Sequence, residues 1–71
     1  MIDIARFDVW DEVRIIAMPK VHDDSFGPPK LGEVGMVVYK SGREGYLVEK
    51  VNKTGHIEWT ADFLPEQLEA A

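Results

Sequence analysis

The segment 31–51 constrains the fold most, because it carries the densest β-branched and aromatic content of the chain. Its pattern predicts a strand over 34–39, a turn with two glycines, and a partner strand over 46–51. Gly32 and Gly35 bracket the start of the first strand, where glycine predicts a positive φ or a close backbone approach. We therefore expect a hairpin at the centre of a β structure.

Shorter patterns predict the flanking elements. Residues 12–17 alternate so that Val13 and Ile15 share a face, which is typical of a strand with one buried side. Leu64 and Leu68 are expected to pack inward near the end of the chain. The other predicted elements are an extended lead-in over 2–11, the glycine turn over 41–45, a turn over 52–55, a strand over 56–60, a 3₁₀ turn over 63–66 and a closing strand over 67–70.

Residues 18–30 form a long irregular segment, in which Pro19, Pro28 and Pro29 cannot donate to a strand ladder. The segment is longer than most connections, and long ordered loops are often functional. Phe26 is the expected anchor that holds it against the body of the protein. Two interpretations stay open, a functional loop and a solvated connector with one packed aromatic side chain.

The order of these elements indicates the fold class. We expect an all-β protein, a small five-stranded SH3-like barrel with a long first loop and a 3₁₀ turn before the last strand. Closing the sheet would remove an exposed strand edge. An OB-fold barrel is the alternative, although it is usually longer and carries a helix between strands. Residues 1–71 are expected to form one domain.

Composition limits the possible functions. The chain has 71 residues, no cysteine and a net charge of −5. The lack of cysteine excludes disulfides, thiolate metal sites and cysteine nucleophiles, and it fits a cytoplasmic location. No apolar run reaches the roughly 18–20 residues that span a bilayer. The negative charge disfavours nucleic acids and anionic membranes as partners, since both attract basic side chains.

Four short motifs resemble those of known small barrels: Phe-Asp-Val-Trp-Asp-Glu-Val-Arg-Ile at 7–15, Gly-Glu-Val-Gly-Met-Val-Val at 32–38, Tyr-Leu-Val-Glu at 46–49 and Leu-Pro-Glu-Gln-Leu-Glu at 64–69. The layout is similar to the electron-transport accessory superfamily. That superfamily includes the photosystem I PsaE subunit, the ferredoxin–thioredoxin reductase variable chain and the nitrile hydratase β-subunit barrel. It is equally similar to small bacterial domains of the DUF4926 type. The resemblance implies a non-catalytic subunit that docks on a larger partner.

Trp10 departs from the pattern of these families, which usually have glycine at that position. A turn that requires a positive φ there would strain a tryptophan. The same residue lies in a polar turn and is expected to be exposed.

No catalytic constellation or metal signature emerges, and we expect neither enzyme activity nor a cofactor. His22, Asp23 and Asp24 are adjacent in an extended loop, so their side chains point apart and do not converge on a cation. No serine lies in a nucleophile-elbow pattern. Gly32-x-x-Gly35 lacks the lysine and the following helix of a phosphate loop.

Exposed aromatic side chains are the best candidates for a binding surface, because they serve cationic and proline-rich ligands in other small barrels. Glu58 and Asp62 are the acids expected beside them. Trp59 is expected in the core, since aromatic side chains dominate the burial of small domains. The residues expected at the partner-binding surface are Trp10, His22, Phe26, Tyr39 and Tyr46.

These observations favour a protein-interaction or accessory subunit whose partner is another protein. Two alternatives remain at this point. One is a nucleic-acid-binding barrel, and the other is a structural protein that associates with itself as a homo-oligomer.

Overall fold

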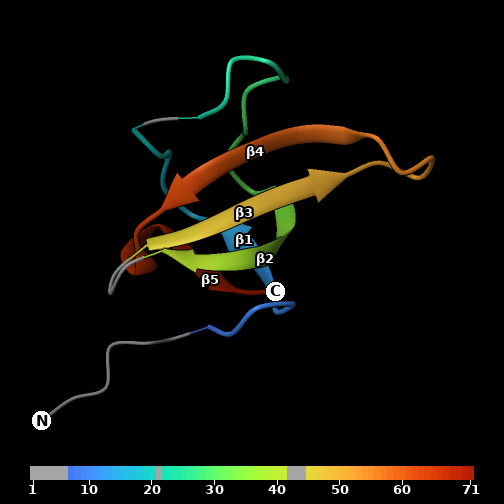
Figure 1. Cartoon of the computed structure of the whole chain (residues 1–71). Helices are drawn as coiled ribbons and strands as arrows, with labels where there is room; N and C mark the ends of the chain where they lie inside the picture. Colours follow the sequence, from blue (N-terminus) through green and yellow to red (C-terminus); the bar gives the residue numbers. More distant parts are fainter. Residues whose placement is uncertain (1–6, 21, 42–44) are drawn as a thin grey trace, which may run out of the picture.

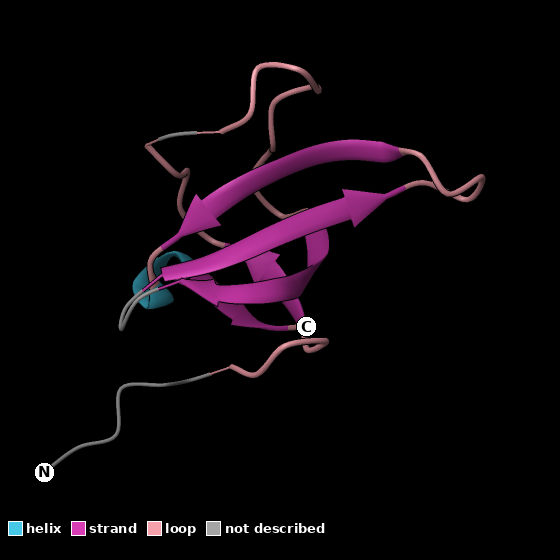
Figure 2. Cartoon of the chain, viewed as in Figure 1, coloured by secondary structure: helices cyan, strands magenta, loops and turns pink. Residues whose placement is uncertain are grey.

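The computed structural model describes residues 7–20, 22–41 and 45–71, and this part of the chain is all-β (Figure 1; Figure 2). Its elements are β1 (Glu12–Ile15), β2 (Val34–Ser41), β3 (Gly45–Val51), β4 (Ile57–Phe63), the 3₁₀ helix η1 (Pro65–Gln67) and β5 (Leu68–Ala70). The order of elements is the predicted one. The first part of the predicted lead-in over 2–11 and the tip of the predicted turn over 41–45 lie outside the described residues.

Neighbouring strands pair antiparallel in the order β4-β3-β2-β1-β5, and the sheet is curved but open (Figure 2). β4 and β5 are its edges, and no pairing between them occurs in the described part of the chain. The predicted closure of the barrel is therefore wrong. Closure would require β4 and β5, the two edge strands, to pair along a staggered register. β5 has only three residues, and they pair with β1 on the other side.

The long first loop covers part of the β4 edge. His22 forms an isolated antiparallel bridge with β4, and the Asp23 N–H donates to the Thr60 carbonyl at 3.1 Å. Farther along the loop, a Cβ atom on Gly27 would lie 3.2 Å from the carbonyl oxygen of Glu58. The loop thus lies along β4 and hides backbone groups that an open sheet edge would offer to another strand.

Pro29, and not Phe26, anchors this loop in the core. The Pro29 ring is fully buried, whereas Phe26 is 37% exposed. The predicted anchoring by Phe26 is therefore wrong, because backbone contacts with β4 and the buried proline ring hold the loop. Phe26 instead lies in a tight turn, in which its N–H donates to the Asp23 carbonyl at 3.3 Å.

Trp59 on β4 is the largest side chain of the core, and its predicted burial is confirmed. Its ring packs edge-on against Phe63, with 6.0 Å between the ring centroids. Its Nε1–H donates to Glu33 Oε1 at 2.9 Å, so the one polar atom of the indole is satisfied. The buried hydrophobic residues are Phe7, Val13, Ile15, Val37, Tyr46, Val48, Trp59, Ala61, Phe63 and Leu68.

The end of β4 differs from the prediction. The strand continues three residues past the predicted end at Thr60, and its alternation puts Ala61 and Phe63 inside. Leu64 then points outward, so its predicted inward packing is wrong, while that of Leu68 is confirmed. The Leu64 N–H donates to Gln67 Oε1 at 2.8 Å and begins η1.

Two glycines before and within β2 serve the two purposes that the sequence predicts. Gly32 has a φ of +87°, the left-handed conformation that glycine adopts without strain. Gly35 faces the core, where a Cβ atom would lie 2.8 Å from Val48 Cγ1 and 2.9 Å from Trp59 Cη2. A side chain at position 35 therefore has no room.

We predict that Gly35→Ala lowers the free energy of unfolding by about 1–3 kcal/mol, because the added methyl overpacks the core. Urea denaturation measures this change, and the NMR position of the Trp59 Nε1–H reports displacement of the indole. Gly32→Ala is the matched control. A methyl group at position 32 meets no neighbouring atom, so this change adds only the strain of a positive φ. If Gly35→Ala left the Trp59 signal as unmoved as Gly32→Ala does, the close approach would be refuted.

Candidate functional site

The candidate site begins at the turn before β1, where Trp10 has a φ of +81°. The Asp11 N–H donates to the Asp8 carbonyl at 3.0 Å, and the Asp8 N–H donates to Asp11 Oδ2 at 2.9 Å. A positive φ at the third position of such a turn is typical of type II, which favours glycine there. Trp10 is the one non-glycine residue with a positive φ among those the structure describes.

Hydrogen bonds on both sides hold this conformation. The Trp10 N–H donates to the Val37 carbonyl at 2.7 Å, and the Val37 N–H donates to the Asp11 carbonyl at 2.9 Å. The turn is therefore attached to β2 and cannot relax without breaking this pairing. A left-handed conformation costs an L-residue roughly 1–2 kcal/mol.

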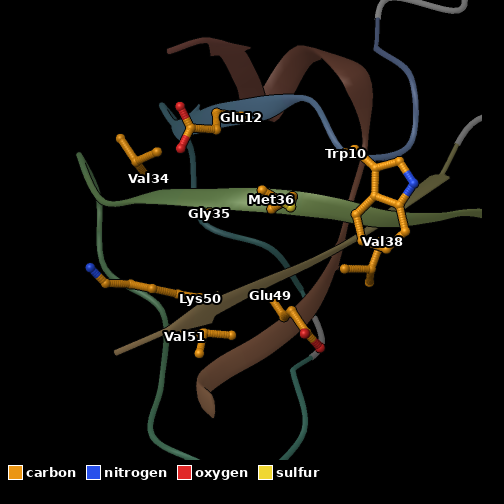
Figure 3. Close-up of a pocket in the computed structure, with 9 residues that line it drawn as sticks. All are labelled: Trp10, Glu12, Val34, Gly35, Met36, Val38, Glu49, Lys50 and Val51. Carbon is orange, nitrogen blue, oxygen red and sulfur yellow. The ribbon is translucent and has the colours of Figure 1, made fainter. Parts of the chain in front are cut away.

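The Trp10 side chain is 69% exposed and lies at the rim of a groove of ≈ 330 Å³ (Figure 3). The groove lies on the outer face of the sheet, over β1, β2 and β3. Figure 3 shows the indole beside Val38 at one end, with Val34 and Lys50 towards the other. The residues that line the groove are Trp10, Glu12, Val34, Gly35, Met36, Val38, Glu49, Lys50 and Val51.

The floor of the groove is apolar because of the alternation of β2. Gly35 and Val37 face the core, so Val34, Met36 and Val38 face outward, and all three are half-buried. The register shifts between Val37 and Tyr39, which indicates a β-bulge at Val38. β2 therefore presents apolar side chains on both of its faces.

Two carboxylates flank the middle of this floor. Glu12 on β1 and Glu49 on β3 are both register partners of Met36, so the three side chains form one row across the sheet. Neither carboxylate forms a hydrogen bond or an ion pair within the described residues. The positive charge of Lys50 is directed towards Glu33, with 3.9 Å between Nζ and Oε2.

The structure separates the five residues that the sequence predicts for partner binding. Trp10 lines the groove, and its predicted exposure is confirmed. Tyr39 is 60% exposed on β2 but does not line the groove. His22 and Phe26 lie in the loop that follows the β4 edge.

Tyr46 is only 3% exposed and belongs to the core. Its ring lies edge-on to Phe7, with 5.4 Å between centroids, and its hydroxyl accepts a hydrogen bond from the Phe7 N–H at 3.2 Å. We therefore leave Tyr46 out of the candidate site.

Three polar side chains of the loop, those of His22, Asp23 and Asp24, were considered as cation ligands. His22 Nδ1 lies 3.9 Å from Asp24 Oδ1 and 3.4 Å from the Asp23 carbonyl oxygen. Within residues 7–20, 22–41 and 45–71, no three histidine, cysteine, aspartate or glutamate side chains come together as metal ligands.

Sequence reasoning missed the floor and the acids of the groove. It named Glu58 and Asp62 as the acids near exposed aromatic rings, but neither lines this groove. The signal was present in the uninterrupted apolar run from Met36 to Tyr39, which indicates a strand with apolar side chains on both faces. Glu12 and Glu49 become neighbours of Met36 only through strand register, which no local pattern contains.

Comparisons of the chain with protein-family models, with curated proteins and with solved structures find no match. The described residues include no helix of the length and hydropathy needed to cross a bilayer. The groove combines an apolar floor, an exposed indole and two carboxylates that have no partner in the described part of the chain, and this combination suits non-covalent binding.

We predict that Trp10→Gly raises the free energy of unfolding by roughly 0.5–1.5 kcal/mol, because glycine adopts a positive φ without strain. Trp10→Ala is the matched control, since it removes the indole and keeps the strain. Urea denaturation of both variants measures the difference. A Trp10→Gly protein less stable than Trp10→Ala would show that the turn does not favour glycine.

Proposed function

We propose that the protein is a non-catalytic interaction module, an accessory subunit that binds another protein through the groove beside Trp10. In type it is an SH3-like barrel of the electron-transport accessory kind, left open between β4 and β5, and it acts in the cytoplasm. The observation that carries the proposal is an exposed tryptophan held in a left-handed conformation at the rim of an apolar groove.

The strain at Trp10 supports this proposal because folding does not account for it. Glycine suits the turn better, and a side chain that is 69% exposed buries little area in return. Residues in rarely populated conformations cluster at ligand clamps and other functional sites. We therefore assign the indole to contact with a partner.

The chemistry of the groove favours a protein partner. Tryptophan is enriched among the residues that dominate binding energy at protein interfaces. Half-buried Val34, Met36 and Val38 add an apolar surface that a partner can cover. The negative charge of the chain, and that of Glu12 and Glu49 beside the floor, repels nucleic-acid phosphates.

Affinity capture from the native lysate tests the proposal with the wild type and Trp10→Gly as paired baits. We expect at least one protein to be retained about tenfold less by Trp10→Gly, since the loss of an interface tryptophan commonly costs more than about 1.4 kcal/mol. Because Trp10→Gly is expected to fold at least as stably as the wild type, such a loss reports contact and not unfolding.

Phe26→Ala is the control bait, because Phe26 lies in the loop beside β4 and does not line the groove. Retention of every captured protein by Trp10→Gly, or equal losses with both variants, would overturn the assignment of the groove.

A further inference from the structure

We infer that the groove binds an extended segment of the partner protein. This segment carries an arginine, with one aliphatic residue two positions before it and another two positions after it. This inference rests on the proposed function and adds the chemistry of the partner. It follows from how the lining side chains are ordered along β2.

The groove consists of three rows across the sheet. The first contains Trp10 and Val38, the middle one contains Met36 with its two flanking glutamates, and the third contains Val34 and Val51. Successive outward side chains of a strand lie about 6.8 Å apart, two residues along the chain. An extended segment that follows β2 places its own alternate side chains at the same spacing, so each of its inward side chains meets one row.

The middle row is suited to bind a positively charged side chain. Glu12 and Glu49 lie on either side of Met36, and neither carboxylate has a cationic partner among the described residues. The two strands that carry them are about two strand spacings apart, roughly 10 Å. A long cationic side chain laid over Met36 therefore lies between the two strands that carry the carboxylates, while its methylene groups cover the apolar floor.

Arginine fits this row better than lysine does. The exposed indole of Trp10 lies next to the middle row, and a planar guanidinium stacks on an aromatic face while its N–H groups still donate to carboxylates. The nearest cation of the groove does not compete, because Lys50 is directed towards Glu33. The outer rows, with Val38 on one side and Val34 and Val51 on the other, suit aliphatic side chains.

The probe is the peptide acetyl-Val-Thr-Arg-Thr-Val-amide, which is symmetric in its groove-facing residues and so binds in either direction. NMR titration of the full chain should shift the Trp10 Nε1–H and the amides of Met36 and Glu49. The same peptide with neutral citrulline in place of arginine should bind about fivefold more weakly, since it keeps the shape and loses the charge. Equal binding of the two peptides, or no shift at these positions at millimolar peptide, overturns the inference.

A pair of charge-matched variants tests the carboxylates. Glu12→Gln with Glu49→Gln should weaken binding of the arginine peptide about fivefold. Glu58→Gln with Asp62→Asn changes the net charge equally on β4 and should leave the affinity within twofold. Equal weakening by both double variants would mean that only the overall charge matters.

The same two double variants separate this inference from the proposed function when used as baits for lysate capture. A protein that Trp10→Gly loses but Glu12→Gln with Glu49→Gln retains would leave the proposed function standing and refute the cationic segment. If the proposed function itself is wrong, the first capture experiment already shows it, because Trp10→Gly then retains every protein that the wild type captures.

Discussion

The packing of the Trp59 indole beneath Gly35 is the contact on which the rest of the sheet depends. The ring fills the space that a side chain at position 35 would occupy. Its hydrogen bond to Glu33 satisfies the only polar atom of the ring and attaches the start of β2 to β4. Because β3 lies between these two strands, their close approach requires the sheet to curve around the core.

Alternation along β2 divides its side chains between the two faces of the curved sheet, and both faces are apolar. Gly35 and Val37 face Trp59 and the other buried residues, so the inner face of β2 is fully packed against the core. Val34, Met36 and Val38 lie on the other face, where an antiparallel sheet usually presents polar side chains to water. The acids of the neighbouring strands flank this outer face without covering it.

Local alternation was enough to predict the order of the strands and turns, although not every strand end, and contacts between distant residues decided most of what was predicted wrongly. Val13 and Ile15 are buried as their spacing predicts. Phe26 is the obvious apolar residue of its loop, yet backbone contacts with β4 and burial of Pro29 determine the path of that loop. The predicted closure of the barrel was wrong for the same reason, since the sequence of one edge strand does not determine whether it pairs with the other.

The candidate site divides in the same way. Exposure of Trp10 was predicted from its place in a polar turn, and the strain of a positive φ there from the glycine that the barrels it was compared with in sequence usually have. Tyr46 shares the buried face of β3 with Val48, and its hydroxyl accepts a hydrogen bond from the Phe7 N–H, a contact across 39 positions that local spacing does not reveal. The carboxylates around Met36 likewise become neighbours only through the register of three strands.

Trp10 lowers the stability of a small domain, and its own environment offers little compensation. A chain of this size has a limited core, so about 1–2 kcal/mol of strain is a substantial part of its stability. The indole is mostly exposed, and burial therefore does not offset that strain. What lies beside it is an apolar floor flanked by two carboxylates that have no partner among the residues the structure describes. The conformation of the backbone and the chemistry of the side chains are independent observations, and both identify the same surface.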